Sequence, residues 1–266
     1  MTTASPDLLG TIVAATRRIV DVREAAKPAR AVAAEQSRTP DGAAFERALR
    51  GNGVAGARVI AECKRRSPSR GILRADYNPA VHARAYADAG AVAVSVLTEP
   101  TFFDGTPDHL RQVRAAVDLP LLRKDFIVTE YQLIEAASLG ADAALLIVGA
   151  VTQGELTTLL RAAEQLSLAA VVEVHDSDEL RRAVDAGSRI IGVNSRNLRT
   201  LSVDREVLER IAAQLPSGVT AVAESGIRTR EDMERLSRAG YDAFLVGERL
   251  IGQPDPGAAL RELRGA

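Results

Sequence analysis

A run of ionisable and hydroxyl side chains follows a short apolar stretch near residue 60. The segment 59–69, VIAECKRRSPS, begins like a buried strand and then presents a carboxylate, an ammonium and two guanidinium groups. Because successive side chains of a strand point to opposite faces, Glu62 and Lys64 share one face and Cys63 lies on the other. A buried ion pair adds little net stability, so it needs a further reason to exist. We therefore predict that Glu62 and Lys64 face a site, the alternative being a purely structural ion pair, and that Cys63 is an apolar packing residue.

Two more ionisable side chains end apolar runs further along the chain. Lys124 lies in PLLRKDFIV and Glu173 lies in AAVVEVHD. Burial disfavours charged groups, so we predict that the pKa of Lys124 is lowered and that of Glu173 raised, which suits proton transfer near neutral pH. We expect Arg123 to point outward to solvent or to a helix, Asp125 to act as a structural cap, and His175 to be a hydrogen-bonding loop residue.

Strand-like runs and helix-like stretches alternate over most of the chain. Four times a helix-like stretch ends at a glycine and an apolar run follows, as in DAGAVAV and SLGADAA. Glycine there can adopt the left-handed conformation that ends a helix, and such alternation implies a parallel sheet. Eight runs qualify as strands, and they begin near Val59, Ala91, Pro120, Ala143, Ala169, Ile190, Thr220 and Ala243.

Eight strand–helix units in about 220 residues fit an α/β fold, a single-domain TIM (β/α)8 barrel, whose usual size is roughly 250 residues. The competing fold is a doubly wound open sheet, but no G-x-G-x-x-G follows the first strand and no segment remains for a second domain. We assign residues 51–266 to the barrel and residues 1–50 to an N-terminal helical extension that covers the barrel mouth. The alternative for the extension is a solvated segment packed on the outside.

The charge balance, 34 Lys and Arg against 35 Asp and Glu, gives a formal net charge of -1. Such a chain has no global attraction for nucleic acid or an anionic membrane, so any affinity for anions must be local. A single cysteine excludes an internal disulfide, and three scattered histidines lack metal-ligand spacing. No apolar run approaches the roughly 18 residues of a membrane span. We expect a cytoplasmic protein without a metal site.

Two glycine-containing turns follow the seventh and eighth predicted strands. They are AESGI, with Glu224, Ser225 and Gly226, and LVGERL, with Gly247 and Glu248. In TIM barrels these two loops frequently bind phosphate, because glycine lets an anion approach backbone N–H groups. Near the first strand, the side chains expected to complete an anion site are those of Lys64, Arg66, Ser67 and Ser69.

Several of these segments together resemble a known family. Eight segments occur in the order and spacing that are typical of indole-3-glycerol-phosphate synthase, namely IAECKRRSPSRG, SVLTEPTFFDG, LLRKDFIV, ALLIV, VVEVHD, IIGVNSRNL, AVAESGI and FLVGERLI. The resemblance runs from about residue 55 to the C-terminus. It implies that 1-(2-carboxyphenylamino)-1-deoxyribulose 5-phosphate closes a ring, loses carbon dioxide and then loses water to yield indole-3-glycerol phosphate, without a cofactor.

The resemblance also implies roles for individual residues. Its catalytic set corresponds to Glu62, Lys64, Lys124, Glu173 and Asn194, and its substrate-binding set to Arg66, Ser67, Ser69, Phe103, Phe126, Arg196, Glu224, Ser225, Gly226, Gly247 and Glu248. Lys124 would be the general acid at the ketone, and Arg196 would bind the anthranilate carboxylate. Which of Glu62, Lys64 and Glu173 serves the dehydration stays open. Arg66 stands where the family often has lysine, and both are cations.

Two other functions share part of this sequence pattern. A barrel like phosphoribosylanthranilate isomerase would have the same phosphate loops but not the set of Glu62, Lys64 and Lys124. A non-catalytic barrel that binds a phosphorylated ligand would be expected to lack an acid or a carboxylate, and all are present. We expect a monomer whose partner is a small phosphosugar, with no nucleic-acid or membrane partner.

Overall fold

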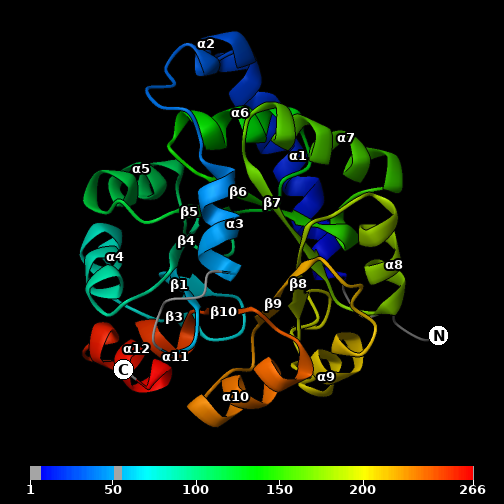
Figure 1. Ribbon diagram of the computed structural model, residues 1–266. Coiled ribbons are helices and arrows are strands. Elements are labelled where there is room, and N and C mark those ends of the chain that lie inside the picture. Colours follow the sequence, from blue (N-terminus) through cyan, green and yellow to red (C-terminus); the bar gives the residue numbers. More distant parts are fainter. Residues whose placement is uncertain (1–6, 51–55, 266) are drawn as a thin grey trace, which may run out of the picture.

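A closed barrel of parallel strands forms the centre of the molecule (Figure 1). The computed structural model describes residues 7–50 and 56–265, and the strands follow one another around the barrel in the order β1-β10-β9-β8-β7-β6-β5-β4. These strands are β1 (Val59–Cys63), β4 (Ala93–Leu97), β5 (Leu121–Lys124), β6 (Ala143–Ile147), β7 (Ala169–Val174), β8 (Ile190–Asn194), β9 (Thr220–Glu224) and β10 (Ala243–Val246). The closed ring confirms the predicted TIM barrel and excludes the doubly wound open sheet.

Most strands begin at the residues that the apolar runs predict. The exceptions are β4, which begins two residues after Ala91, and β5, which begins one residue after Pro120. The N–H of Ala91 is used to cap the preceding helix, since it donates to the carbonyl oxygen of Tyr86. Pro120 has no N–H to donate to a neighbouring strand.

Helices connect the strands on the outside of the barrel and complete the eight repeating units. They are α4 (Pro79–Asp88), α5 (Pro107–Ala116), α6 (Glu130–Ser138), α7 (Gln153–Gln165), α8 (Ser177–Asp185), α9 (Glu206–Ala212), α10 (Arg230–Ala239), α11 (Glu248–Ile251) and α12 (Pro256–Arg264). At the start of α4 the Asn78 side chain accepts a hydrogen bond of 3.1 Å from Val81 N, and proline fills the first helical position. This cap satisfies an N–H that the helix itself leaves free.

Three helices precede the barrel, namely α1 (Leu8–Ala26), α2 (Ala29–Ala33) and α3 (Gly42–Arg50). The last of them, α3, closes the end of the barrel at which the strands begin. Gly42 N donates to Ser167 O at 2.9 Å just before β7, and the Arg50 side chain bonds Thr220 at the start of β9. A Cβ on Gly42 would overlap the backbone of Ala169, so this close approach requires glycine.

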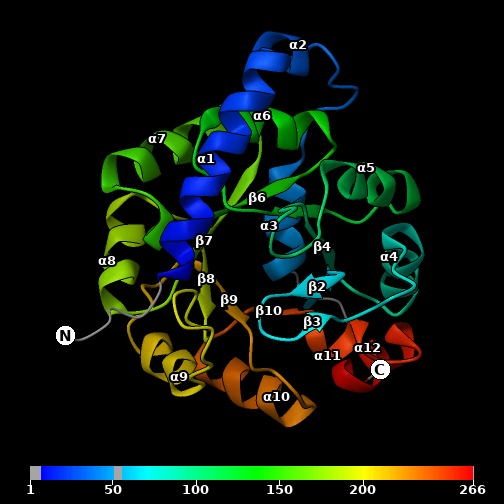
Figure 2. The same ribbon diagram turned by 180° about the vertical axis from the view of Figure 1, so that it is seen from behind.

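The first helix, α1, lies toward the opposite end of the barrel. It packs against α6 and against η1 (Val148–Ala150), the turn that follows β6, and its N-cap residue Asp7 pairs with Arg199 beyond β8. Figure 1 shows α3 in front of the barrel and Figure 2, seen from behind, shows α1 in front. Residues 51–55 lie outside the described ranges, so the division at residue 50 into an extension and a barrel stays a prediction.

Successive side chains of β1 point alternately toward the inside of the barrel and toward the surrounding helices. Cys63 is fully buried on the helix side, with its Sγ 3.8 Å from Pro79 O at the start of α4. Burial raises the pKa of its thiol, so the thiol stays protonated and unreactive. The predicted packing role of Cys63 is confirmed.

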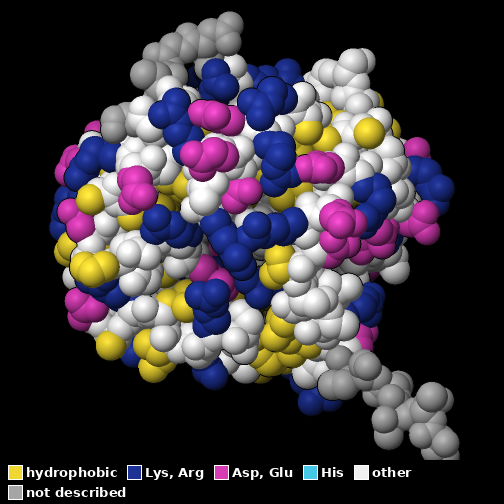
Figure 3. All heavy atoms as spheres, turned by 90° about the horizontal axis from the view of Figure 1, so that it is seen from below, with side chains coloured by type: hydrophobic (Ala, Val, Ile, Leu, Met, Phe, Trp, Pro, Cys, Tyr) yellow, Lys and Arg dark blue, Asp and Glu magenta, His cyan; other side chains and the backbone are white. Residues whose placement is uncertain are grey.

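The surface carries charges of both signs. Lys and Arg side chains are interspersed with Asp and Glu side chains on the face drawn in Figure 3, in keeping with the net charge of -1. Within residues 7–50 and 56–265, no three His, Cys, Asp or Glu side chains are grouped to hold a metal ion. In the same part of the chain, no helix combines the length and the apolar character that crossing a bilayer requires.

Candidate active site

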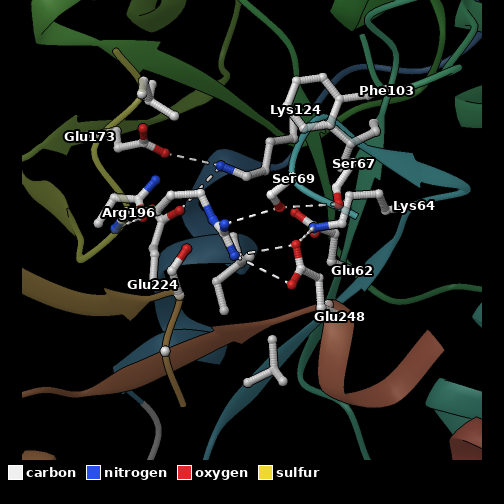
Figure 4. A pocket seen from close by; sticks show the side chains of 18 of the residues that line it. Glu62, Lys64, Ser67, Ser69, Phe103, Lys124, Glu173, Arg196, Glu224 and Glu248 are labelled. Atoms are coloured by element: carbon white, nitrogen blue, oxygen red, sulfur yellow. Dashed lines mark hydrogen bonds and ion pairs between the residues drawn. The ribbon is translucent and has the colours of Figure 1, made fainter. Parts of the chain in front are cut away.

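The carboxyl ends of the parallel strands meet at one mouth of the barrel. Five polar side chains reach this mouth from the final residues of β1, β5, β7, β8 and β9, namely Glu62, Lys124, Glu173, Asn194 and Glu224. They line a single cavity of about 400 Å³ (Figure 4). The closed ring therefore gathers side chains that lie up to 162 residues apart in the sequence, from 62 to 224.

Every predicted site residue except Arg66 lines this cavity. The residues brought together are Glu62, Lys64, Ser67, Ser69, Phe103, Lys124, Phe126, Glu173, Asn194, Arg196, Glu224, Ser225, Gly226, Gly247 and Glu248. Arg66 lies in β2 (Arg66–Ser67), which pairs with β3 (Gly71–Ile72) in a small hairpin beyond β1. Its side chain is exposed while that of Ser67 is buried, so the hairpin points Arg66 away from the cavity and the geometry does not support its predicted substrate contact.

The ammonium of Lys124 lies between two buried carboxylates. Its Nζ is 3.0 Å from Glu173 Oε2 and 3.1 Å from Glu224 Oε2, and each carboxylate side chain is 1% exposed. An ammonium has three N–H donors, so two hold it in place and one remains for a bound molecule. The lysine is therefore fixed at the inner end of the cavity with a donor to spare.

These contacts reverse two of the predicted pKa shifts. Burial alone would lower the pKa of the Lys124 ammonium, but the charges of Glu173 and Glu224 outweigh burial and raise it. Burial alone would raise the pKa of the Glu173 carboxyl, but the ammonium of Lys124 and the imidazole of His175 lower it. The predictions were wrong because they considered burial without the charged partners.

Glu224 has a carboxyl group whose pKa is raised toward neutral pH. Burial and the neighbouring charge of Glu173 raise the pKa of its carboxyl to about 8, against the opposing effect of Lys124. The two carboxylates share one ammonium and so titrate as a pair in which Glu173 ionises first. The cavity thus holds an ionised carboxylate and a second carboxyl able to carry a proton.

His175 follows β7 and contacts Glu173 from the side away from Lys124. Its Nε2 is 3.3 Å from Glu173 Oε1 in an ion-pair contact, and its Nδ1 is 2.9 Å from Glu179 Oε2. Burial would lower the pKa of the imidazole, but the two carboxylates raise it to about 10. His175 is the polar residue we expected, and it also supplies a second positive charge to Glu173.

The pair at the end of β1 has the geometry that alternation predicts. Lys64 Nζ is 2.6 Å from Glu62 Oε1, and both side chains face the cavity (Figure 4). Glycine on the neighbouring strand end leaves room for this carboxylate, because a Cβ on Gly247 would overlap Glu62 Oε1. In the same way, a Cβ on Gly192 in β8 would overlap Glu224 Oε1. Two of the inward-facing carboxylates therefore depend on a glycine one strand away.

Glu248, at the start of α11, forms ion pairs with several basic side chains at the outer part of the cavity. Its carboxylate is 3.3 Å from Arg196 Nη2, 3.4 Å from Arg70 Nε and 4.0 Å from Lys64 Nζ. Arg196 also donates to Ser69 Oγ at 3.1 Å, which ties the β1 hairpin to the loop after β8. The sequence analysis missed Arg70, whose largely exposed side chain pairs with Glu248 from outside the cavity lining.

An apolar wall faces these charges. The rings of Phe103 and Phe126 lie with centroids 6.2 Å apart and planes inclined by 37°. Phe103 is held by Glu99, whose carboxylate accepts hydrogen bonds from the backbone N–H groups of Thr101, Phe102 and Phe103 at 2.8, 2.7 and 3.1 Å. Further apolar lining that the sequence analysis missed comes from Leu97, Leu145, Ile147, Leu198, Leu201, Val203 and Ile227.

Barrel and cavity together define a TIM-barrel enzyme whose acid–base groups lie at the carboxyl ends of the strands. The indole-3-glycerol phosphate synthase family profile matches residues 9–263 of this chain. Two relatives carry that name. The one from Mycolicibacterium vanbaalenii is 49% identical over 259 residues, covering 97% of this chain and 94% of the relative. The one from Streptomyces griseus is 51% identical over 234 residues, covering 88% and 85%.

This chain therefore belongs to the indole-3-glycerol phosphate synthase family, the carboxy-lyases that form indole-3-glycerol phosphate in tryptophan biosynthesis. The match favours the synthase over an isomerase-like barrel and over a non-catalytic one. Among solved structures, thiamine phosphate pyrophosphorylase from Pyrococcus furiosus is similar, with a TM-score of 0.60 and 18% identity over 78% of this chain and 94% of that chain. At that identity the similarity supports the barrel fold alone.

Proposed function

We propose that this chain converts 1-(2-carboxyphenylamino)-1-deoxyribulose 5-phosphate to indole-3-glycerol phosphate with Lys124 as the general acid. The ring carbon that bears the carboxylate attacks the ketone carbon, carbon dioxide leaves, and water is then eliminated. The observation that carries the proposal is the ammonium of Lys124 held between Glu173 and Glu224 at the inner end of the cavity.

Lys124 suits the first step because of where negative charge develops. As the new carbon–carbon bond forms, the ketone oxygen becomes an alkoxide and needs a positively charged donor. The raised pKa keeps Lys124 protonated, and its two ion pairs fix it before the substrate arrives. A donor fixed in advance stabilises the transition state without reorganisation. The alkoxide is a stronger base than an amine, so the proton passes from Lys124 to oxygen.

The elimination of water requires one group that removes a proton and one that gives a proton to the leaving hydroxyl. Glu173 suits the base, because Lys124 and His175 lower its pKa and keep it ionised. Two groups can serve as the acid, namely Lys64 beside Glu62, and Glu224 with its raised pKa. This assignment adds Glu224 to the proton-transfer groups, beyond the substrate-binding role that the sequence suggested.

Other predicted residues are suited to bind the carboxylate, the aromatic ring and the phosphate of the substrate. Arg196 is the partner for the anthranilate carboxylate, since a guanidinium can bind a carboxylate through two parallel hydrogen bonds. The rings of Phe103 and Phe126 provide the wall for the aromatic ring. Ser225 and Gly226 both have left-handed backbone conformations, with φ of 63° and 71°, and their turn faces the cavity where the phosphate would lie.

The direct test is turnover of the proposed substrate by the purified chain. Incubation with 1-(2-carboxyphenylamino)-1-deoxyribulose 5-phosphate should produce indole fluorescence and release carbon dioxide in equal molar amounts. The same preparation should leave phosphoribosylanthranilate unchanged, which separates the synthase from an isomerase-like barrel. Isomerisation of phosphoribosylanthranilate without indole formation would contradict the proposal.

A further inference from the structure

A buried guanidinium lies directly beside the catalytic strand end. The side chain of Arg123 is 0% exposed and points away from the cavity, into the layer between β5 and α6. Its Nε donates to Thr98 Oγ1 at 3.1 Å, its Nη1 to Gln132 O at 2.8 Å and its Nη2 to Asp125 Oδ2 at 2.9 Å. Both Nη atoms also lie 3.3 Å from Glu135 Oε2. All five N–H groups of the guanidinium are thus used.

These bonds fix the backbone on both sides of Lys124. Asp125 Oδ1 accepts a hydrogen bond from Phe126 N at 2.9 Å, and its Oδ2 accepts one from Thr98 Oγ1 at 2.6 Å. Thr98 N in turn donates to Lys124 O at 3.1 Å. The residues before and after the lysine therefore belong to one buried network, and the lysine side chain leaves that network on the opposite face of the strand.

The network reaches the N-terminal helix through one oxygen atom. Arg23, near the end of α1, donates from Nη2 to Glu135 Oε2 at 2.9 Å, and this is the same oxygen that faces Arg123. Without Arg23, the single positive charge of Arg123 would face the two carboxylates of Asp125 and Glu135. Arg23 brings the cluster to neutrality, which matters because unbalanced charge is costly at buried positions.

We infer that Arg23 is a positioning residue for Lys124 and that it acts through Glu135 and Arg123. The inference rests on the proposed role of Lys124 as the general acid. A shift of the strand end by a fraction of an ångström would disturb the contacts of 3.0 and 3.1 Å that aim the ammonium. Misplacement of a catalytic group lowers the rate of the chemical step while the binding contacts persist.

The chain offers a matched control on the same helix. Arg17, also in α1, donates to Glu155 Oε1 of α7 at 2.8 Å, and this pair has no link to the network around Arg123. Arg17→Gln and Arg23→Gln each remove one ion pair between α1 and a barrel helix. If these ion pairs serve only to hold α1 against the barrel, the two variants should have the same kcat. If the network positions Lys124, only the second should impair the chemistry.

The experiment measures kcat and KM of wild type, Arg17→Gln, Arg23→Gln and Arg23→Lys, at a temperature at which circular dichroism shows all four folded. Arg23→Gln should lower kcat roughly three- to thirtyfold with KM unchanged, the range typical of couplings through contiguous contacts. Arg17→Gln should stay within about twofold of wild type, and Arg23→Lys should recover most of the loss because it restores the positive charge.

Equal kcat values for Arg17→Gln and Arg23→Gln would overturn the inference, as would a loss in Arg23→Gln that appears only in KM. A loss that Arg23→Lys does not recover would also overturn the role of the charge at this position. Wild-type turnover tests the proposed function, whereas the ratio between the two glutamine variants tests the positioning role. The two proposals can therefore fail separately.

Discussion

Replacement of Lys124 by alanine removes the single positive charge between Glu173 and Glu224. In the wild type this ammonium is 3.0 and 3.1 Å from two carboxylates that are each 1% exposed. Loss of a general acid lowers kcat by about 10² to 10⁴. Loss of a fixed charge at a developing oxyanion costs about 10² to 10³ in mutants of other enzymes. The two effects come from the same group and overlap, so we expect kcat to fall by at least about 10³.

The substrate should still bind to this variant. Arg196, the apolar wall and the turn at Ser225 and Gly226 are untouched, so KM should change by less than about tenfold. The assay is indole fluorescence under saturating substrate. Arg111→Ala is the control, because Arg111 belongs to an exposed ion pair with Asp108 and neither residue lines the cavity. A folded Lys124→Ala protein whose kcat lies within tenfold of wild type would refute the role assigned to the lysine.

The Lys124→Ala variant should also be less stable than the wild type, to an extent that depends on pH. Without the ammonium, two buried carboxylates face each other, and breaking a buried ion pair costs about 3–5 kcal/mol when the remaining charge stays unpaired. The pKa of the Glu224 carboxyl is already raised to about 8 in the wild type, and Lys124 opposes that rise. Without the ammonium, the pKa of this carboxyl in the folded variant should therefore rise further above its value in the unfolded chain. Such a group favours the folded state at low pH and loses that effect as the pH rises through its folded pKa. The Tm deficit of Lys124→Ala should therefore be larger at pH 8 than at pH 5, and thermal unfolding at the two pH values checks it.

Three further variants probe the neighbouring groups. Glu173→Gln should lower kcat by about 10² to 10⁴ while KM changes little, and equal losses in binding and rate would indicate a positioning role instead. The pKa of Glu224 is raised to about 8 from 4.5, so its stabilising effect is complete below pH 4.5 and is lost as the pH rises through about 8. The Tm of wild type should accordingly fall more steeply with pH across this range than that of Glu224→Gln, and parallel curves would contradict the assignment. Gly247→Ala should lower both kcat and Tm, by about 1–3 kcal/mol in the free energy of unfolding, because its Cβ would overlap Glu62. Gly154→Ala, with nothing within 4 Å of the added Cβ, is the control and should be neutral or slightly stabilising.

The barrel and the position of the main site residues could be predicted because they follow from local rules. A strand that ends in alternating polar residues points every second side chain inward, which places Glu62 and Lys64 on one face and Cys63 on the other. Parallel strands in a closed ring then bring such ends together without knowledge of any particular contact. Lys124 and Glu173 were located by the same two rules.

The electrostatics could not be predicted in this way, because they depend on partners that are distant in the sequence. Lys124 and Glu224 are 100 residues apart, and no local pattern indicates that their side chains lie within 3.1 Å. Burial acts on each residue alone, whereas the sign of a pKa shift depends on which charge comes closest. For Arg66 and Arg70 the difficulty was geometric, since the direction of each side chain depends on the register of a hairpin only two residue pairs long.

The glycines at positions 192 and 247 bear on any attempt to move this chemistry to another barrel. Each one vacates the space that a carboxylate on the adjacent strand occupies, Glu224 in one case and Glu62 in the other. A designer who grafted only the acidic side chains onto a host with ordinary residues at those neighbouring positions would push them out of alignment. A design that transfers this site to another barrel therefore has to transfer each glutamate together with the glycine on the neighbouring strand.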